Sequence, residues 1–194
     1  DLQGNITDRR AGRIAGNDAI QLTESLKDIR VPGVEIDVKH VLDYRFVVVM
    51  RGEGLCSDVS DTDPQRVGVP ALSAVARSPN ARRTADLFNV WIDAARRVLE
   101  DHQIANSLTM RGFSSDPSLP VYSDVYKLRA ACVSVYPMYK GVACLAGMDV
   151  LSFSGDTVRD EFAALASGWN DYNFFFMHVK DTDSRGEDGD FDGK

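Results

Sequence analysis

The stretch that decides the fold reads FFFMHVK over residues 174–180 and continues as DTDSRGEDGD over residues 181–190. An aromatic, apolar run of this length is typical of a fully buried strand, and the Gly- and Asp-rich segment after it is typical of a loop. Ligands of α/β folds bind outside the carboxyl ends of strands. The six carboxylates between Asp181 and Asp192 repel one another unless water or a cation screens them. The sequence therefore predicts half of a metal site at the end of a buried strand.

Two other interpretations of the acidic segment compete with a metal site. The first, third, sixth and twelfth positions of a calcium-binding EF-hand loop are matched by Asp181, Asp183, Gly186 and Asp192. However, Arg185 at the fifth position would point a cation at a cation, and the preceding segment is typical of a strand rather than of an entering helix. The EF-hand is therefore disfavoured, and a solvated acidic turn is the alternative to a metal site.

Composition and charge narrow the class of protein. The 194 residues are 44% hydrophobic, which is enough for a core, and the net charge of −7 argues against a nucleic-acid or anionic-membrane binder. We expect no signal peptide in the first residues, and no apolar stretch approaches the ~18 residues of a membrane span. The three cysteines include no Cys-x-x-Cys pattern and suit reduced thiols. We expect a soluble, cytoplasmic protein with no nucleic-acid and no membrane partner.

Hydrophobic periodicity and turn residues predict alternating strands and helices. We expect strands at residues 34–38, 46–50, 108–110 and 128–135, the second of them central because it is β-branched and apolar throughout. Helices are expected near residues 17–26, from Ser78-Pro79 through 99, at 138–146, and from Thr157 on, where Thr157 and Asp160 have capping-box spacing. This alternation is typical of a layered α/β architecture.

The segment 114–120 is rich in Ser, Pro and Asp and predicts a boundary between two parts of the chain. We expect one domain at residues 1–115 and a second at residues 116–194.

Arginines form a second group of candidate binding residues. Arg9, Arg10 and Arg13 fall in a Gly-containing loop, and Arg51 and Arg111 each follow an expected strand. Guanidinium groups in such places suit bidentate binding of phosphate or carboxylate, although most surface arginines are simply solvated. Asp58, Asp61 and Asp63 are acidic residues that could instead be their ion-pair partners. His178 is interpreted as a neutral core histidine, and no Ser/His/Asp set or phosphate-binding Gly-rich loop is recognisable.

Seven segments in chain order carry a resemblance to a known family. They are residues 7–13 (TDRRAGR), 44–55 (YRF to RGEGL), 58–64 (DVSDTDP), 128–131 (LRAA), 136–141 (YPMYKG), 147–149 (GMD) and 175–190. Together they resemble the archaeal-type cofactor-independent phosphoglycerate mutases of the alkaline phosphatase superfamily.

The resemblance implies a fold and an activity. The fold is an α/β one, with a mixed-sheet, layered insertion domain at residues 1–115 that binds the substrate, followed at residues 116–194 by part of an alkaline-phosphatase-like metal-binding core. The activity is a glycolytic and gluconeogenic isomerisation between 2- and 3-phosphoglycerate. In the family it proceeds through a phosphoserine at a two-metal centre and needs no 2,3-bisphosphoglycerate.

Site residues are also implied by the resemblance. Asp183 matches a metal ligand of the family, and Glu187 stands where the family usually has a histidine, which favours manganese or magnesium over zinc. The substrate-binding candidates are Arg9, Arg10, Arg13, Arg51, Asp58, Asp61 and Arg129. The acidic residues of this set, together with Asp63, are candidates for orienting the arginines. Val125 replaces a basic residue common in the family, so that either Lys127 or Arg129 would have to take its role.

The resemblance further implies that the chain is an internal fragment. The nucleophilic serine is expected upstream and further metal ligands downstream, so the fragment alone is expected to contain no catalytic nucleophile and to be inactive. Alternatives are a phosphatase or phosphopentomutase of the same superfamily, or a non-catalytic module that binds cations or phosphate. The oligomeric state is left open, and an oligomer is compatible with the sequence.

Overall fold

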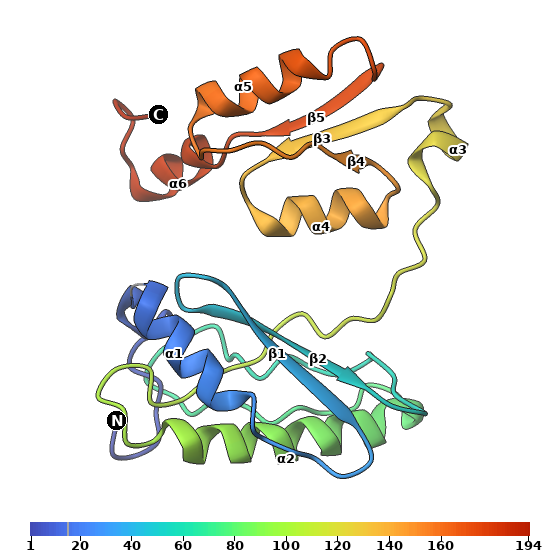
Figure 1. Ribbon diagram of the computed structural model, residues 1–194. Coiled ribbons are helices and arrows are strands. Elements are labelled where there is room, and N and C mark those ends of the chain that lie inside the picture. The colour runs from blue at the N-terminus through green and yellow to red at the C-terminus, as the bar shows by residue number, and fades with distance from the viewer. Residues whose placement is uncertain (15) are drawn as a thin grey trace. The chain divides into compact units, whose positions relative to one another are not determined.

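The computed structural model describes residues 1–14 and 16–194, apart from the side chains of Glu187 and Asp188. The chain divides into two compact units, Asp1–Asp116 and Pro117–Lys194, and each has its own sheet and helices (Figure 1). The division falls inside the Ser-, Pro- and Asp-rich segment 114–120. The mixed α/β class predicted from the sequence is confirmed.

The first unit contains a two-stranded antiparallel sheet and two main helices. Its elements are the 3-10 turn η1 (Ala11–Arg13), α1 (Gly16–Leu26), β1 (Glu35–Leu42), β2 (Arg45–Arg51), η2 (Pro79–Ala81) and α2 (Arg82–Leu99). Strand β2 pairs with β1 and is half-buried, so the prediction of a central strand was wrong. The β-branched residues of β2 cover the core with one face only, which periodicity in a short apolar run cannot reveal.

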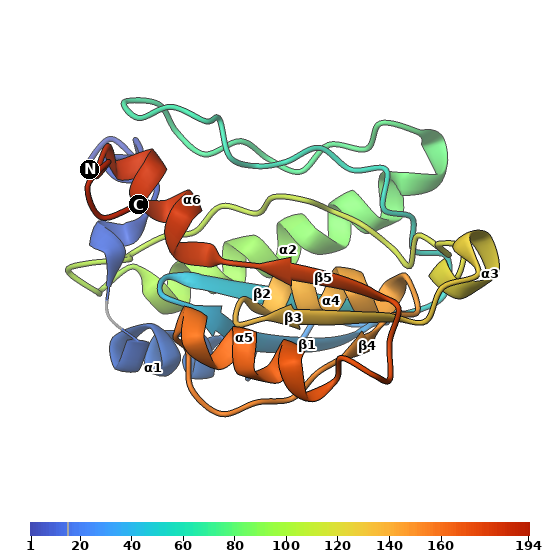
Figure 2. The same cartoon turned by 90° about the horizontal axis from the view of Figure 1, so that it is seen from above.

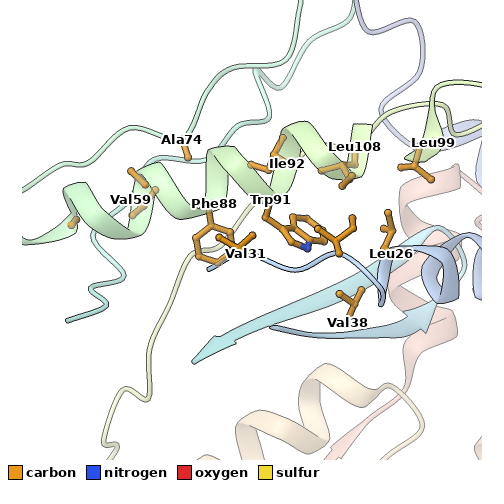
Figure 3. Packing of buried hydrophobic residues seen from close by; sticks show 14 residues of the cluster. Leu26, Val31, Val38, Val59, Ala74, Phe88, Trp91, Ile92, Leu99 and Leu108 are labelled. Atoms are coloured by element: carbon orange, nitrogen blue, oxygen red, sulfur yellow. The ribbon is translucent and has the colours of Figure 1, made fainter. Parts of the chain in front are cut away.

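The core of the first unit lies between α2 and the β1–β2 hairpin (Figure 3). The predicted apolar stripe of α2 is confirmed, since its buried residues include Ala85, Phe88, Trp91, Ile92, Ala95 and Leu99. Trp91 is fully buried and its ring lies 6.4 Å from that of Phe46 on β2. Burial of each large apolar side chain here stabilises the fold by about 1.5–3 kcal/mol.

Long loops complete the first unit. Residues 52–78 run out and back as an extended loop (Figure 2), tied together by the bridge between Val59 and Ala76. The expected strand at residues 108–110 is absent from the described strands. Instead the main chain of Met110 pairs with Thr62, whose N–H donates to the Met110 carbonyl at 2.8 Å.

The second unit contains a three-stranded parallel sheet in the order β4-β3-β5. Its elements are α3 (Tyr122–Tyr126), β3 (Ala130–Ser134), α4 (Pro137–Leu145), β4 (Asp149–Val150), α5 (Val158–Ser167), β5 (Phe174–His178) and α6 (Lys180–Asp188). Helices α4 and α5 cover opposite faces of the sheet (Figure 1). Every residue of β3 is buried, whereas β5 is half-buried throughout. The prediction of full burial for residues 174–178 was therefore wrong, because among the described strands β5 pairs only with β3.

The acidic segment after β5 was predicted to be a loop, and it is helix α6 instead. Asp181 and Asp183 lie in its first turn, where negative charge interacts favourably with the helix dipole. Gly189 ends the helix in the left-handed conformation, with φ of 73°. Terminal interactions of this kind outweigh the low helix propensity of a Gly- and Asp-rich sequence.

The two predicted helix starts differ. The Thr157–Asp160 capping box of α5 is confirmed, because the Asp160 N–H donates to Thr157 and the Asp160 carboxylate accepts the Thr157 N–H. Ser78 precedes η2 without a capping hydrogen bond from its side chain. Within residues 1–14 and 16–194, no helix has the length and apolar character that a membrane crossing requires.

Candidate functional site

Three chain segments of the first unit converge on one carboxylate, Asp63. The main chain of Ile6 exchanges hydrogen bonds with Val69 and Gly68 at 2.9 and 2.8 Å, which brings the N-terminal segment beside residues 63–70. The pairing of Thr62 with Met110 brings the third segment alongside. Side chains from residues far apart in sequence thus meet at Asp63.

Arg9, Asp63 and Arg111 form an ionic cluster, here called the Asp63 cluster. The Arg9 guanidinium donates to Asp63 from Nε to Oδ1 at 3.0 Å and from Nη2 to Oδ2 at 2.6 Å. The Arg111 Nη1 lies 3.6 Å from Oδ2, and the Gln65 N–H donates to Oδ1 at 2.8 Å. The Asp63 side chain is only 4% exposed, whereas Arg9 and Arg111 are 30% and 58% exposed.

The ionisation of the Asp63 cluster follows from this geometry. The hydrogen-bonded Arg9 guanidinium lowers the pKa of Asp63 below its ordinary value, with help from the Gln65 N–H and against the effect of burial. Asp63 is therefore an anion at neutral pH, which holds the Arg9 guanidinium by two hydrogen bonds and forms a longer ion pair with the more exposed Arg111. Such an arrangement can bind a carboxylate or a phosphate through the donors that Asp63 leaves free.

Arg10 and Arg13 lie on a turn that begins at Asp8. The Asp8 carboxylate accepts the N–H groups of Arg10 and Gly12 at 2.6 and 2.9 Å, and these bonds lower the pKa of Asp8. Ala11, Gly12 and Arg13 have positive φ values of 50°, 61° and 53°. A non-glycine residue in this region costs about 1–2 kcal/mol, so the turn holds a strained backbone beside the Asp63 cluster.

Asp61 and Asp58 have different positions. One Asp61 oxygen accepts the Gly112 N–H at 2.8 Å, so Asp61 helps to hold the segment that carries Arg111. Asp58 is exposed, and its main-chain carbonyl accepts the Arg77 N–H. Among the three acidic residues of this loop, Asp63 is the one that pairs with arginine side chains in the described structure.

Arg51 lies apart from the Asp63 cluster. Among the described residues, the partners of Asp63 are Arg9, Gln65 and Arg111, and Arg51 is not one of them. The pKa of Arg9 is raised mainly by its hydrogen bond to Asp63. Arg51 is the last residue of β2, six residues beyond Arg45 and hence about 20 Å away along the strand. There it lines an open cavity of about 480 Å³ together with Gly33, Val34, Glu35, Gly52 and Glu53.

In the second unit, Arg129 and Asp183 lie at opposite ends of the sheet. The main-chain carbonyl of Arg129 accepts the N–H groups of Asn173 and Phe174 at the amino ends of β3 and β5. Asp183 follows the carboxyl end of β5, in the first turn of α6. The structure thus does not bring these two candidates together within this unit.

The candidate metal ligands do not form a complete site. Asp183 pairs with Lys180, and this hydrogen bond lowers the pKa of Asp183. The side chain of Glu187 lies outside the described residues. Among the described residues, no group of three or more His, Cys, Asp or Glu side chains could hold a metal ion. The described donors therefore do not fit a divalent cation by themselves.

Comparison with known proteins identifies the family. The family model described as 2,3-bisphosphoglycerate-independent phosphoglycerate mutase matches residues 1–105, which include Arg9 and Asp63. The chain belongs to this family. Two relatives named "Probable 2,3-bisphosphoglycerate-independent phosphoglycerate mutase" support the assignment across its whole length. They come from Thermosipho melanesiensis and Thermus thermophilus, at 42% and 43% identity over 100% of this chain.

The chain matches only part of the length of its relatives in this phosphoglycerate mutase family. The chain spans 48% and 49% of those two relatives, about half of their length. The solved cofactor-independent phosphoglycerate mutase of Thermoplasma acidophilum is similar at a TM-score of 0.65 and 26% identity, over 92% of this chain and 51% of that one. A protein from Pyrococcus horikoshii shares the fold at a TM-score of 0.66.

Sequence reasoning and structure differ in which residues they emphasise. The sequence offered Asp63 as an ion-pair partner and orienting group alongside Asp58 and Asp61, and Arg111 as a strand-end arginine, but neither Asp63 nor Arg111 was among the substrate-binding candidates. Glu161 was missed altogether, although it is buried on α5. Its signal was a charged residue three positions before buried Ala164, on the apolar face of an otherwise ordinary helix.

Proposed function

We propose that this chain is the substrate-binding part, with an adjoining portion of the catalytic core, of an enzyme that interconverts 2- and 3-phosphoglycerate without 2,3-bisphosphoglycerate. Membership of the phosphoglycerate mutase family supports the activity. The observation that carries the assignment to this part of the enzyme is the Asp63 cluster, in which a buried carboxylate holds Arg9 by hydrogen bonds and lies within ion-pair distance of Arg111.

The chemistry of the cluster suits a phosphoglycerate. A guanidinium carries five N–H donors, and Asp63 accepts two hydrogen bonds from Arg9. The remaining donors of Arg9, with those of Arg111, are available for the carboxylate or the phosphate of the substrate. Because Asp63 fixes Arg9 in advance, less side-chain entropy is lost when the anion binds.

The other candidate contacts remain parts of the proposal. Arg10 and Arg13 extend the positive surface on the strained turn, and Asp61 fixes the segment of Arg111. Arg51, Asp58 and Arg129 lie elsewhere in their units, so we assign them contacts with other parts of the substrate or of the enzyme. The two domains assigned at residues 1–115 and 116–194 correspond to substrate binding and to part of the metal-binding core.

We also propose that the enzyme requires divalent metal ions. We expect two divalent cations in the full-length enzyme, manganese or magnesium rather than zinc, with Asp183 and Glu187 among their oxygen ligands. Since the described donors are incomplete, the remaining ligands and the serine nucleophile are expected from the additional half that the relatives possess. Three cysteines without a disulfide suit a cytoplasmic location.

The experiment uses the full-length protein in a coupled assay that follows conversion of 3- to 2-phosphoglycerate with added manganese and without 2,3-bisphosphoglycerate. We expect activity in the wild type and a loss of about 10- to 100-fold in kcat/KM for Arg111→Ala, because a charge-assisted hydrogen bond is worth about 1.5–3 kcal/mol. Arg97→Ala, at an exposed arginine of α2, is the matched control and should leave kcat/KM unchanged.

Two outcomes would contradict the proposal. Hydrolysis of other phosphate esters without phosphoglycerate conversion would point to a phosphatase or phosphopentomutase. If Arg111→Ala and Arg97→Ala changed kcat/KM by the same factor, the Asp63 cluster would not be part of the substrate-binding site, although the enzyme could still be a phosphoglycerate mutase.

A further inference from the structure

A buried hydroxyl group, that of Thr62, directly precedes Asp63 in the chain. Thr62 is 0% exposed, and its Oγ1 accepts the Met110 N–H at 2.7 Å. The same hydroxyl donates to the Met110 carbonyl oxygen at 3.4 Å, so it contacts both polar groups of that residue. A buried N–H that loses its acceptor carries the cost of its desolvation, so an apolar side chain is a poor substitute for this hydroxyl.

The main chain of Thr62 explains why a side chain has to accept the Met110 N–H. In antiparallel strands, two residues of a hydrogen-bonded pair exchange both of their N–H···O bonds. Here the Thr62 N–H donates to the Met110 carbonyl at 2.8 Å, but the Thr62 carbonyl accepts the Leu72 N–H at 2.8 Å. The hydroxyl therefore takes the place of the carbonyl, and Thr62 joins three segments of the chain.

The bonds made by Thr62 and Asp61 enclose the main chain of Arg111. The residue before Arg111 donates its N–H to Thr62 at 2.7 Å, and Gly112 after it donates its N–H to Asp61 at 2.8 Å. The Arg111 side chain is 58% exposed, and its Nη1 lies 3.6 Å from Asp63 Oδ2. Because a long, exposed side chain has many rotamers, the position of its main chain limits where the guanidinium can reach.

The loop that carries Asp63 is attached to α2 by bonds that do not involve Thr62. The Cys56 N–H donates to Thr84 Oγ1 at 2.8 Å. Ala74 and Asn89 are joined by two hydrogen bonds, of 2.9 and 2.8 Å, between the main chain of Ala74 and the amide of Asn89. Loss of the Thr62 hydroxyl should therefore leave the loop on α2 and act mainly on the segment that carries Arg111.

We propose that Thr62 is a positioning residue for substrate binding, whose hydroxyl group fixes the main chain before Arg111 so that the guanidinium meets the anion at the Asp63 cluster. The inference rests on the proposed function for the identity of that anion, a phosphoglycerate. Thr62 acts through Arg111 rather than by touching the substrate. Loss of its hydroxyl should therefore weaken the binding of 3-phosphoglycerate and leave turnover nearly unchanged.

Hydrogen exchange of the full-length protein, followed by NMR, tests the hydroxyl without any activity measurement. We expect a protected Met110 amide in the wild type, exchange at least ~10-fold faster in Thr62→Val, and recovery to within ~2-fold in Thr62→Ser. An unprotected Met110 amide in the wild type would overturn the proposal, whether or not the valine variant folds.

Thr23→Val is the matched control, because it also removes the hydroxyl of a buried threonine in the first unit. The Thr23 hydroxyl donates to the Ala19 carbonyl within α1 at 2.7 Å, whereas that of Thr62 accepts a main-chain N–H. Thr23→Val should leave the exchange of the Met110 amide unchanged. Equal acceleration in Thr23→Val and Thr62→Val would contradict a local role for the Thr62 hydroxyl.

Steady-state kinetics test the positioning role. KM for 3-phosphoglycerate should rise about 5- to 10-fold in Thr62→Val while kcat stays within about 2-fold, and Thr62→Ser should restore KM. Thr23→Val should change neither constant. General destabilisation would reduce the amount of active enzyme and hence the apparent kcat, so it would not raise KM alone. An unchanged KM in Thr62→Val would overturn the inference.

A double-mutant cycle tests whether Thr62 acts through Arg111. Once Arg111→Ala has removed the guanidinium, addition of Thr62→Val should change KM by less than about 2-fold, because the two residues act as one unit. If the effects of the two substitutions on KM multiplied instead, Thr62 would act independently of Arg111 and the inference would be wrong.

Calorimetry separates this inference from the proposed function, because it measures the Kd of 3-phosphoglycerate without turnover. A Kd raised about 5- to 10-fold in Thr62→Val, in a protein that does not interconvert phosphoglycerates, would contradict the function and support the inference. Interconversion by a wild type whose KM and Kd are both unchanged in Thr62→Val would support the function and contradict the inference.

Discussion

Asp63 and Glu161 are buried carboxyl groups in the two units, and their surroundings move their pKa values in opposite directions. Asp63 accepts two hydrogen bonds from Arg9, which lower its pKa despite burial. For Glu161 burial is the largest influence and raises the pKa, because the neutral N–H of Val135 lowers it by less than burial raises it. The comparison teaches that the charge of the partner, more than the depth of burial, decides whether the pKa of a buried carboxyl group is lowered or raised.

The two units also differ in how they use tryptophan. Trp91 is fully buried in the core of the first unit, whereas Trp169 is 64% exposed and stacks on Phe175 at 5.9 Å. The first unit thus supports its charged cluster on a closed apolar core, while the second exposes aromatic surface around a thin sheet.

The largest expected effect tests this difference in cores. Trp91→Ala should destabilise the protein by about 3–5 kcal/mol, because it removes a fully buried ring and leaves a cavity. Trp169→Ala should cost less than about 1.5 kcal/mol, the upper value for a single aromatic stack. Urea denaturation followed by circular dichroism measures the free energy of unfolding of both variants. Similar decreases for the two would contradict the difference between a closed core in the first unit and exposed aromatic surface in the second.

The next effect concerns Asp63. Asp63→Asn should lower the free energy of unfolding by about 2 kcal/mol near neutral pH, because the charge-assisted bonds from Arg9 are lost. The folded-state pKa lies below the ordinary value of 3.8, so this contribution is present above 3.8 and is lost as the pH falls through the lowered pKa. Denaturation at a series of pH values should show the gap between wild type and variant closing in acid. A gap independent of pH would argue against an ionised Asp63.

A smaller effect compares the two helix starts. Thr157→Ala should destabilise by about 1 kcal/mol, because Thr157 accepts the Asp160 N–H in the capping box. Ser78→Ala should stay within about 0.5 kcal/mol, since the Ser78 side chain makes no capping bond. Thermal unfolding of the two variants measures the difference, and equal shifts would be inconsistent with the observed caps.

The smallest expected effect is a change at Glu161 in how the free energy of unfolding depends on pH. Its raised folded-state pKa means that the contribution of the protonated carboxyl group is complete below the ordinary value of 4.5 and is lost as the pH rises through the folded-state pKa. Glu161→Gln cannot ionise and should therefore gain stability relative to the wild type as the pH rises, opposite in sign to Asp63→Asn. Denaturation at matched pH values checks the sign. If the stability of both variants relative to the wild type changed in the same direction with rising pH, the contrast between Asp63 and Glu161 would be wrong.

Local patterns predicted those parts of the fold that depend on neighbours in sequence. The spacing of Phe88, Ile92 and Ala95 predicted the buried face of α2, and Thr157 with Asp160 predicted the start of α5. Helix α6 was not predicted, because its stability comes from terminal interactions rather than from apolar spacing. The apolar run of β5 did not reveal an edge strand, because periodicity reports burial of faces and not the number of neighbouring strands.

The candidate site depended on contacts that leave no periodic signal. Arg9 and Asp63 are 54 positions apart, and they meet because the main chain of Ile6 pairs with residues 68–69. The sequence did mark these residue types as binding candidates, from the chemistry of guanidinium groups. It could not tell that Arg51 lies at the far end of β2 or that Asp63, rather than Asp58, holds the arginines.

The Asp63 cluster also bears on how an anion reaches the protein. The chain carries a net charge of −7, which repels an anion at long range, whereas the cluster presents two guanidinium groups around one carboxylate. Salt screens exposed charges beyond about 10 Å at 0.1 M ionic strength. Attraction by the cluster therefore acts only on anions already near the surface, and the net charge of these 194 residues does not steer anions toward it.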